Sequence, residues 1–213
     1  MKKLRLILGD QLNHKHSWYQ EQDDEVVYFM AEMRQETDYV KHHIQKVVAF
    51  FMAMREFASW LQERGHTVVY YQLDDARNTQ SLTENLEQLI VQYDIEQFEY
   101  QLPDEYRLDE LLVRFRESVN IPVQSCDTEH FMSSRTDLQE FFKGKKQFTM
   151  EYFYRMMRKR YDIMMINDKD PEGGKWNFDH SNRNKWKGET LIPHERGFRK
   201  DAREIVELLE KEG

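Results

Sequence analysis

The sequence predicts an α/β fold: a three-layer, Rossmann-like sandwich around a five-stranded, mainly parallel sheet, followed by a helical and irregular C-terminal extension. Short apolar runs alternate with longer amphipathic stretches from residue 2 to about residue 127, and the first run stops abruptly at Gly9. This alternation requires crossover connections, which place helices on both faces of a parallel sheet. With right-handed crossovers, we expect the strand order 3-2-1-4-5.

The strands are predicted from short runs rich in β-branched and aromatic residues, bounded by polar or turn-forming residues. The first run ends at Gly9-Asp10, which is typical of a tight turn after a buried strand. The same reasoning applies to the four later runs. We therefore expect strands at residues 4–8, 25–30, 67–71, 97–100 and 122–124.

The helices between these strands are predicted from apolar residues at helical spacing. Residues 39–64 form the longest such stretch, with Asp38 as a suitable N-cap and Gly65 as a suitable terminator. Shorter helices are expected at residues 81–93 and 104–119.

The pattern changes in the extension, so we expect a first domain at residues 1–132 and a connector at residues 133–213. A short helix ending at Phe142 and a second helix at 150–160 are predicted, capped by Ser134 or Thr136 and by Thr149. Residues 161–197 show no sustained periodicity and are expected to form a long loop. An amphipathic helix is predicted at 201–211.

Composition excludes several classes of protein. No apolar stretch approaches the roughly 20 residues that span a bilayer, and the apolar run at the start is too short for a signal peptide. We therefore expect a cytoplasmic protein without membrane contact. The single cysteine, Cys126, excludes an internal disulfide and a cysteine-ligated iron–sulfur cluster within this chain, and we expect it to be structural.

The charge is distributed unevenly. The net charge is −8, yet residues 141–200 hold 15 Lys or Arg against 8 Asp or Glu, a balance of +7 that leaves −15 for the remainder. The same segment carries aromatic residues at 148–154 and at Trp176 and Trp186. Arginine and exposed aromatic rings bind phosphates and unstacked bases, but they also pack against other domains. Both interpretations remain open from the sequence.

A ligand site is predicted beyond the first strand. Gly9 allows a sharp turn, and Asp10 and Gln11 then offer donors and acceptors where open α/β sheets bind ligands; the alternative is a simple turn cap. The sequence contains neither a GxGxxG nor a GxxxxGK[ST] motif, so neither a dinucleotide cradle nor a P-loop is indicated.

A second wall of this site is predicted after the second strand. Glu36 is suited to accept a hydrogen bond from an N–H of a flat heterocycle. Tyr39, His43 and Lys46 would share one helix face, and Phe50 would extend it with an apolar surface. Adjacent histidines on a helix point about 100° apart, so residues 42–43 do not predict a metal site. We find no recognisable nucleophile motif and predict no catalytic residue in this chain.

Five stretches are specific when taken jointly: residues 6–12, 39–43, 53–55, 149–155 and 173–183. Together they resemble the deoxyribodipyrimidine photolyase-related proteins, the bacterial branch of the photolyase/cryptochrome family that includes prokaryotic (6-4) photolyases. The resemblance covers residues 4 to about 183, nearly the whole chain.

This resemblance implies a light-harvesting role for the first domain. In that family it holds an antenna chromophore, a lumazine such as 6,7-dimethyl-8-ribityllumazine. The full-length proteins continue into a helical domain in cis, with FAD and a cysteine-bound four-iron cluster, which transfers an electron to damaged DNA in light. The residues at the positions of the family's lumazine pocket are Gly9, Asp10, Gln11, Glu36, Tyr39 and His43, with Lys46 and Phe50 beside them.

The resemblance therefore implies a light-dependent DNA repair flavoprotein, a lyase, of which this chain is the inactive antenna domain plus connector. Two other functions remain open from the residues alone. One is an independent α/β module that binds a small ligand without photochemistry. The other is a nucleic-acid-binding module that uses residues 141–200.

Overall fold

The computed structural model describes residues 1–34, 38, 40–188, 190–197 and 199–212. It divides into two compact units. The first comprises Met1–His130 together with Lys200–Gly213, and the second comprises Phe131–Arg199. The chain thus leaves the first unit close to the expected boundary at residue 132, and its last segment returns to that unit.

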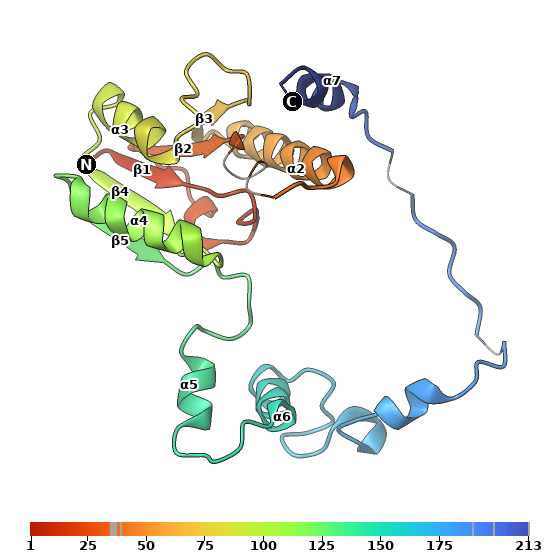
Figure 1. Cartoon of the computed structure of the whole chain (residues 1–213). Helices are drawn as coiled ribbons and strands as arrows, with labels where there is room; N and C mark the ends of the chain where they lie inside the picture. The colour runs from red at the N-terminus through yellow and green to blue at the C-terminus, as the bar shows by residue number, and fades with distance from the viewer. Residues whose placement is uncertain (35–37, 39, 189, 198, 213) are drawn as a thin grey trace. The chain divides into compact units, whose positions relative to one another are not determined.

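The first unit is built on one parallel sheet (Figure 1). Its strands are Lys3–Leu6 (β1), Val26–Ala31 (β2), Thr67–Tyr71 (β3), Gln97–Gln101 (β4) and Val123–Cys126 (β5). They pair in the order β3-β2-β1-β4-β5, and every pair is parallel. The predicted topology is confirmed.

Helices cover both faces of this sheet. The helices α2 (Ile44–Glu63) and α7 (Arg203–Glu212) pack on one face. The helices α3 (Leu82–Gln92) and α4 (Tyr106–Ser118) pack on the other. The three-layer arrangement that the sequence predicts is therefore confirmed.

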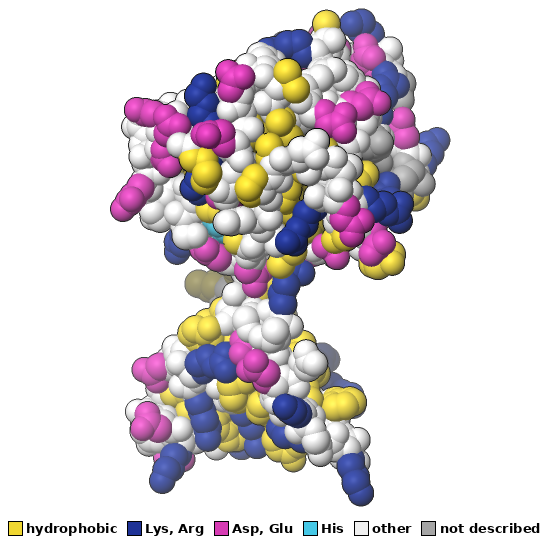
Figure 2. Space-filling model, turned by 90° about the vertical axis from the view of Figure 1, so that its left-hand side faces the viewer, with side chains coloured by type: hydrophobic (Ala, Val, Ile, Leu, Met, Phe, Trp, Pro, Cys, Tyr) yellow, Lys and Arg dark blue, Asp and Glu magenta, His cyan; other side chains and the backbone are white. Residues whose placement is uncertain are grey.

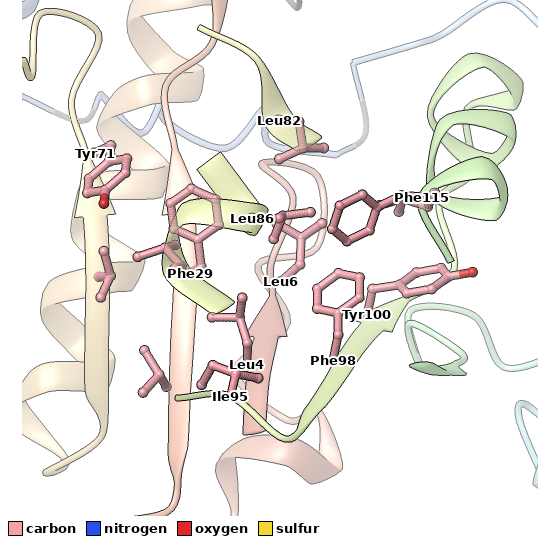
Figure 3. Packing of buried hydrophobic residues seen from close by; sticks show 14 of the residues in the cluster. Leu4, Leu6, Phe29, Tyr71, Leu82, Leu86, Ile95, Phe98, Tyr100 and Phe115 are labelled. Atoms are coloured by element: carbon pink, nitrogen blue, oxygen red, sulfur yellow. The ribbon is translucent and has the colours of Figure 1, made fainter. Parts of the chain in front are cut away.

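The core on the α3/α4 face shows why the strands are buried. Leu4 and Leu6 of β1 lie between Phe29 of β2 and Phe98 of β4, and Leu86 of α3 covers them (Figure 3). Each of these five side chains is almost completely removed from water. Burial on this scale contributes about 25 cal/mol per Å² of apolar surface.

The first strand is shorter than predicted. The amide of Ile7 still donates to the Phe29 carbonyl of β2 at 3.0 Å, but the amide of Leu8 donates to Oε1 of Gln11 at 3.0 Å instead. The side chain of Gln11 therefore takes over a donor that would have continued the ladder. The prediction of a strand through residue 8 is wrong for this reason.

The long helix also starts later than predicted. His43 has an extended backbone, and its Nδ1 accepts the amide of Gln45 at 3.2 Å, so the helix begins at Ile44. The predicted start at residue 39 and the predicted N-cap Asp38 are wrong. Gly65, with a φ of +85°, follows the end of the helix as predicted. The other predicted helices are confirmed to within two residues at each end.

The second unit contains α5 (Asp137–Phe142) and α6 (Met150–Tyr161). Two short 3-10 turns, η2 (Glu172–Gly174) and η3 (Asp179–Arg183), interrupt the irregular chain that follows. Phe142 and Phe153 stack with their ring centroids 6.4 Å apart and join α5 to α6. Across the described ranges, none of the helices has both the length and the apolar character that crossing a membrane requires.

Candidate functional site

A cavity of about 220 Å³ lies at the carboxyl ends of β1 and β2. This is the edge at which parallel sheets bind ligands. We call this cavity the crevice. The turn after β1, the chain leaving β2, and residues of α2, α3 and α4 line it. Its apolar walls include Ala31, Met33, Phe50, Phe51, Met54 and Leu82.

Gly9 and Phe50 meet inside the crevice. A Cβ atom built on Gly9 would lie 2.2 Å from Cε1 of Phe50 and 2.9 Å from Sδ of Met54, far closer than real contacts. The Phe50 ring therefore occupies space that exists because residue 9 has no side chain. Of the predicted site residues, Gly9, Asp10 and Phe50 are brought together here.

Asp10 and Glu105 give the crevice its polar residues. Desolvation of the carboxyl group raises the pKa of Asp10, although the residue as a whole is exposed, and the charges of Asp104 and Glu105 raise it further. A backbone hydrogen bond and the charge of His130 lower that pKa by less, so the net shift is upward. Glu105 also accepts the amides of Arg107 and Leu108 as the N-cap of α4.

Gln11 lies behind the turn rather than in the crevice. It is buried, and its Nε2 donates to the carbonyl of Gln101 at 3.1 Å while its Oε1 accepts from Leu8. The Gln11 side chain thus closes the turn at Leu8 and connects it to Gln101 of β4. These two hydrogen bonds fix the position of Gly9 and Asp10.

Two further predicted residues lie elsewhere on the N-terminal part of α2. His43 caps that helix, and Nζ of Lys46 lies 3.1 Å from Nδ1 of His42. Neither His43 nor Lys46 lines the crevice. The expected common helix face is not formed, because His43 precedes the helix. Glu36 and Tyr39 lie outside the described residues.

A buried ion pair lies next to residues that line the crevice. Glu32 follows β2 and is fully buried; its carboxylate accepts Nε of Arg55 at 2.6 Å and Nη2 of Arg55 at 3.1 Å. The Tyr70 hydroxyl and the Leu73 amide complete its hydrogen bonds at 2.8 and 2.9 Å. The remaining nitrogen, Nη1 of Arg55, lies 2.7 Å from Oε1 of Glu204 on α7.

The shifts in this cluster follow from that geometry. Burial alone lowers the pKa of Arg55, but the hydrogen bonds and the charge of Glu32 outweigh it, so the net shift is upward. Burial and the adjacent carboxylate raise the pKa of Tyr70. No motif or spacing in the sequence predicts this pair. Its signal is an acidic residue directly after an entirely apolar strand.

The second unit holds a separate cavity of about 760 Å³ between α6 and the chain around η2 and η3. The buried Arg158 lines it and donates from Nε to the Ile163 carbonyl at 3.0 Å and from Nη2 to the Met164 carbonyl. The guanidinium carbon of Arg158 lies 5.3 Å from the centre of the Trp176 ring, and Nζ of Lys159 lies 5.5 Å from the centre of the same ring.

The surface of the second unit places hydrophobic side chains beside Lys and Arg side chains (Figure 2). Several of its aromatic residues are exposed, as the sequence suggests for a binding surface. They are Phe131, Phe148, Tyr152, Tyr154, Tyr161, Phe178 and Trp186.

The chain is similar in sequence to a known protein family and to individual proteins. Residues 5–213 match the family described as "Deoxyribodipyrimidine photo-lyase-related protein". A (6-4) photolyase of Agrobacterium fabrum is 33% identical over 216 residues, which cover 99% of this chain and 42% of that protein. An uncharacterized protein of Acanthamoeba polyphaga mimivirus is 33% identical over 85 residues, which cover 38% of this chain and 43% of that protein. The aligned part is thus less than half of each relative's length.

Proposed function

The chain belongs to the deoxyribodipyrimidine photolyase-related family, and from this premise we propose that its first unit binds a lumazine-type antenna chromophore in the crevice. The observation that carries the proposal is a small, mainly apolar cavity at the sheet edge with carboxyl groups among its lining residues. Apolar walls with a few polar groups are typical of sites for flat organic ligands.

The chemistry of the crevice residues supports this proposal. Met33 and Met54 offer polarizable surfaces to a flat ring, and Asp10 offers a carboxyl group to its imide N–H. Glu36 and Tyr39 lie outside the described residues, and we propose them as a second acceptor and a further contact of the ligand. Gln11 acts indirectly, since it holds the turn. His43 and Lys46 have no direct part in the crevice as described.

The size of the crevice limits this fit. About 220 Å³ is below the roughly 300 Å³ at which ligand pockets usually begin. Because the Phe50 ring lies over Gly9, we infer that this ring moves when a whole lumazine enters.

For the whole protein, we propose the activity of a light-dependent DNA photolyase. If bound, the antenna would supply light absorption and resonance energy transfer to FAD. FAD, a four-iron cluster and the contact with damaged DNA are proposed for a further domain in cis. The described residues of the crevice would bind and orient the antenna.

Titration with 6,7-dimethyl-8-ribityllumazine tests the proposal. We expect a shifted and enhanced near-ultraviolet band on binding. Phe50→Leu should lower the Kd by up to about tenfold, as expected if the ring blocks the crevice in roughly nine-tenths of the molecules. The control is Phe148→Leu, an equivalent change at an exposed residue of the second unit.

The outcomes separate the proposal from its alternative. Binding that is strengthened by Phe50→Leu and unchanged by Phe148→Leu supports an antenna site in the crevice. If no lumazine binds to the wild type or to Phe50→Leu while another flat heteroaromatic ligand does, the chain is a ligand-binding module without this antenna.

A second candidate function is nucleic-acid binding by residues 141–200, supported by the +7 balance and the exposed aromatic residues. We expect weak binding to single-stranded DNA that declines with salt. Lys185→Gln with Lys187→Gln should reduce the slope of log K against log salt by about 1.4, or 0.7 for each lost phosphate contact.

The matched control replaces two exposed lysines of the first unit, Lys2 and Lys15, by glutamine. This change should leave the slope unaltered. An equal loss of slope in both double variants would show non-specific attraction, and no binding in low salt would remove this candidate.

A further inference from the structure

The chain leaving β2 contributes side chains both to the crevice and to the ion pairs beside it. Ala31 and Met33 line the crevice, whereas Glu32 binds Arg55 and Arg34 binds Glu212 of α7. The amide of Glu32 still donates to the Tyr71 carbonyl of β3 at 2.9 Å, so this chain remains paired to the sheet there. Successive side chains of a paired strand point to opposite sides, which explains why Ala31 and Glu32 serve different sites.

The other crevice wall has the same double role. Met54 of α2 lines the crevice, and the next residue, Arg55, joins Glu32 to Glu204 of α7. Two walls of the crevice are therefore each connected to α7 by an arginine. The Arg34 connection is the shorter, with Nη2 lying 2.6 Å from Oε2 of Glu212.

Helix α7 packs beside α2 through apolar side chains. Ile205 and Leu208 are buried in the cluster that α2 forms with the sheet. A cavity of about 440 Å³ adjoins α7, and its lining includes Arg34 and Leu73 as well as Glu212 of α7. Space next to this contact allows a short helix to shift, since such shifts are limited mainly by packing.

We propose that docking of α7 and occupancy of the crevice are thermodynamically coupled, with Arg34 and Arg55 as positioning residues. This inference rests on the proposed function, because the ligand is the lumazine named there. When α7 is docked, the two arginines hold the walls at Met33 and Met54 in the geometry that accepts the ring. When α7 shifts, those walls lose a support, and affinity falls.

The coupling is reciprocal by necessity. If docked α7 raises the affinity for ligand by some factor, bound ligand raises the docking equilibrium of α7 by the same factor. Binding of the ligand in the crevice therefore shifts the docking equilibrium of α7.

The experiment measures both directions on the 213-residue chain. Glu212→Gln weakens the Arg34 connection, and Leu208→Ala loosens the apolar contact of α7. We expect each variant to raise the Kd for 6,7-dimethyl-8-ribityllumazine by at least about fivefold. Glu207→Gln, an exposed position on the same helix, should leave the Kd unchanged.

Hydrogen exchange of the α7 amides supplies the independent readout. Saturating lumazine should slow exchange in α7 of the wild type by a factor similar to the Kd change in Leu208→Ala. Glu212→Gln serves as the milder variant if Leu208→Ala fails to fold.

Failure of this inference and failure of the proposed function differ in outcome. If the wild type binds no lumazine, the proposed site is wrong and the coupling falls with it. If the wild type binds lumazine, but neither the Kd in the α7 variants nor exchange in α7 responds, the site stands and the coupling is wrong.

Discussion

Arg55→Ala should lower the free energy of unfolding of the first unit by about 3–5 kcal/mol. The reason is the carboxylate of Glu32, which is fully buried and receives two of its four hydrogen bonds from the Arg55 guanidinium. Without Arg55 that charge is left in an interior where isolated charges are costly. Urea unfolding followed by far-ultraviolet circular dichroism measures the loss.

The matched control is Arg77→Ala. Arg77 pairs with Asp75 at 2.7 Å, but its side chain is 63% exposed, and surface pairs contribute at most about 1 kcal/mol. A loss in Arg55→Ala as small as the loss in Arg77→Ala would show that water reaches Glu32 in solution, contrary to the described burial.

The pH dependence of this effect has a definite sign. The pKa of Arg55 is raised, so its charge and the stability that the pair provides persist below the ordinary arginine pKa, throughout the accessible range. The deficit of Arg55→Ala relative to the wild type should therefore stay constant as the pH is varied between about 6 and 9, and urea unfolding across that range measures it.

The sheet could be predicted from the sequence because its signals are local and repeated. Thr67–Tyr71 is found exactly where β-branched and aromatic residues predict it, and the alternation with helices determines parallel pairing. The predicted end of β1 and start of α2 are wrong because, at each, a side chain accepts a hydrogen bond from a backbone amide. Gln11 takes the amide of Leu8, and His43 takes that of Gln45, and neither event changes the hydrophobic pattern.

The candidate site could be predicted less completely, since it depends on which side chains the tertiary fold brings together. The sequence placed Gly9, Asp10 and Phe50 at one site, and they meet in the crevice. It did not predict the connection from Glu32 through Arg55 to α7, because the contacting residues are 23 and 149 positions apart. No spacing rule for one helix or one strand reaches that far.

Arg158→Ala should destabilise the second unit by about 1–3 kcal/mol, because the carbonyls of Ile163 and Met164 lose the charged donor that the buried Arg158 supplies. The Arg158 guanidinium binds the carbonyls of Ile163 and Met164, which lie in the sharp turn after α6. Residues Asp162 and Met164 of this turn have φ angles of +52°, a conformation that needs support from its surroundings. Faster hydrogen exchange and faster proteolysis at residues 161–176 measure the change.

Two comparison variants distinguish hydrogen bonding from the contact with Trp176. Lys159→Ala removes a cation that lies 5.5 Å from the same ring but is exposed, so it should leave proteolysis unchanged. Arg158→Lys keeps a cation near the ring but loses the planar fork that reaches both carbonyls. We therefore expect Arg158→Lys to lose most of the stability that Arg158→Ala loses. If Arg158→Lys instead behaves like the wild type, the charge beside Trp176 stabilises this turn, and the two carbonyl bonds contribute little.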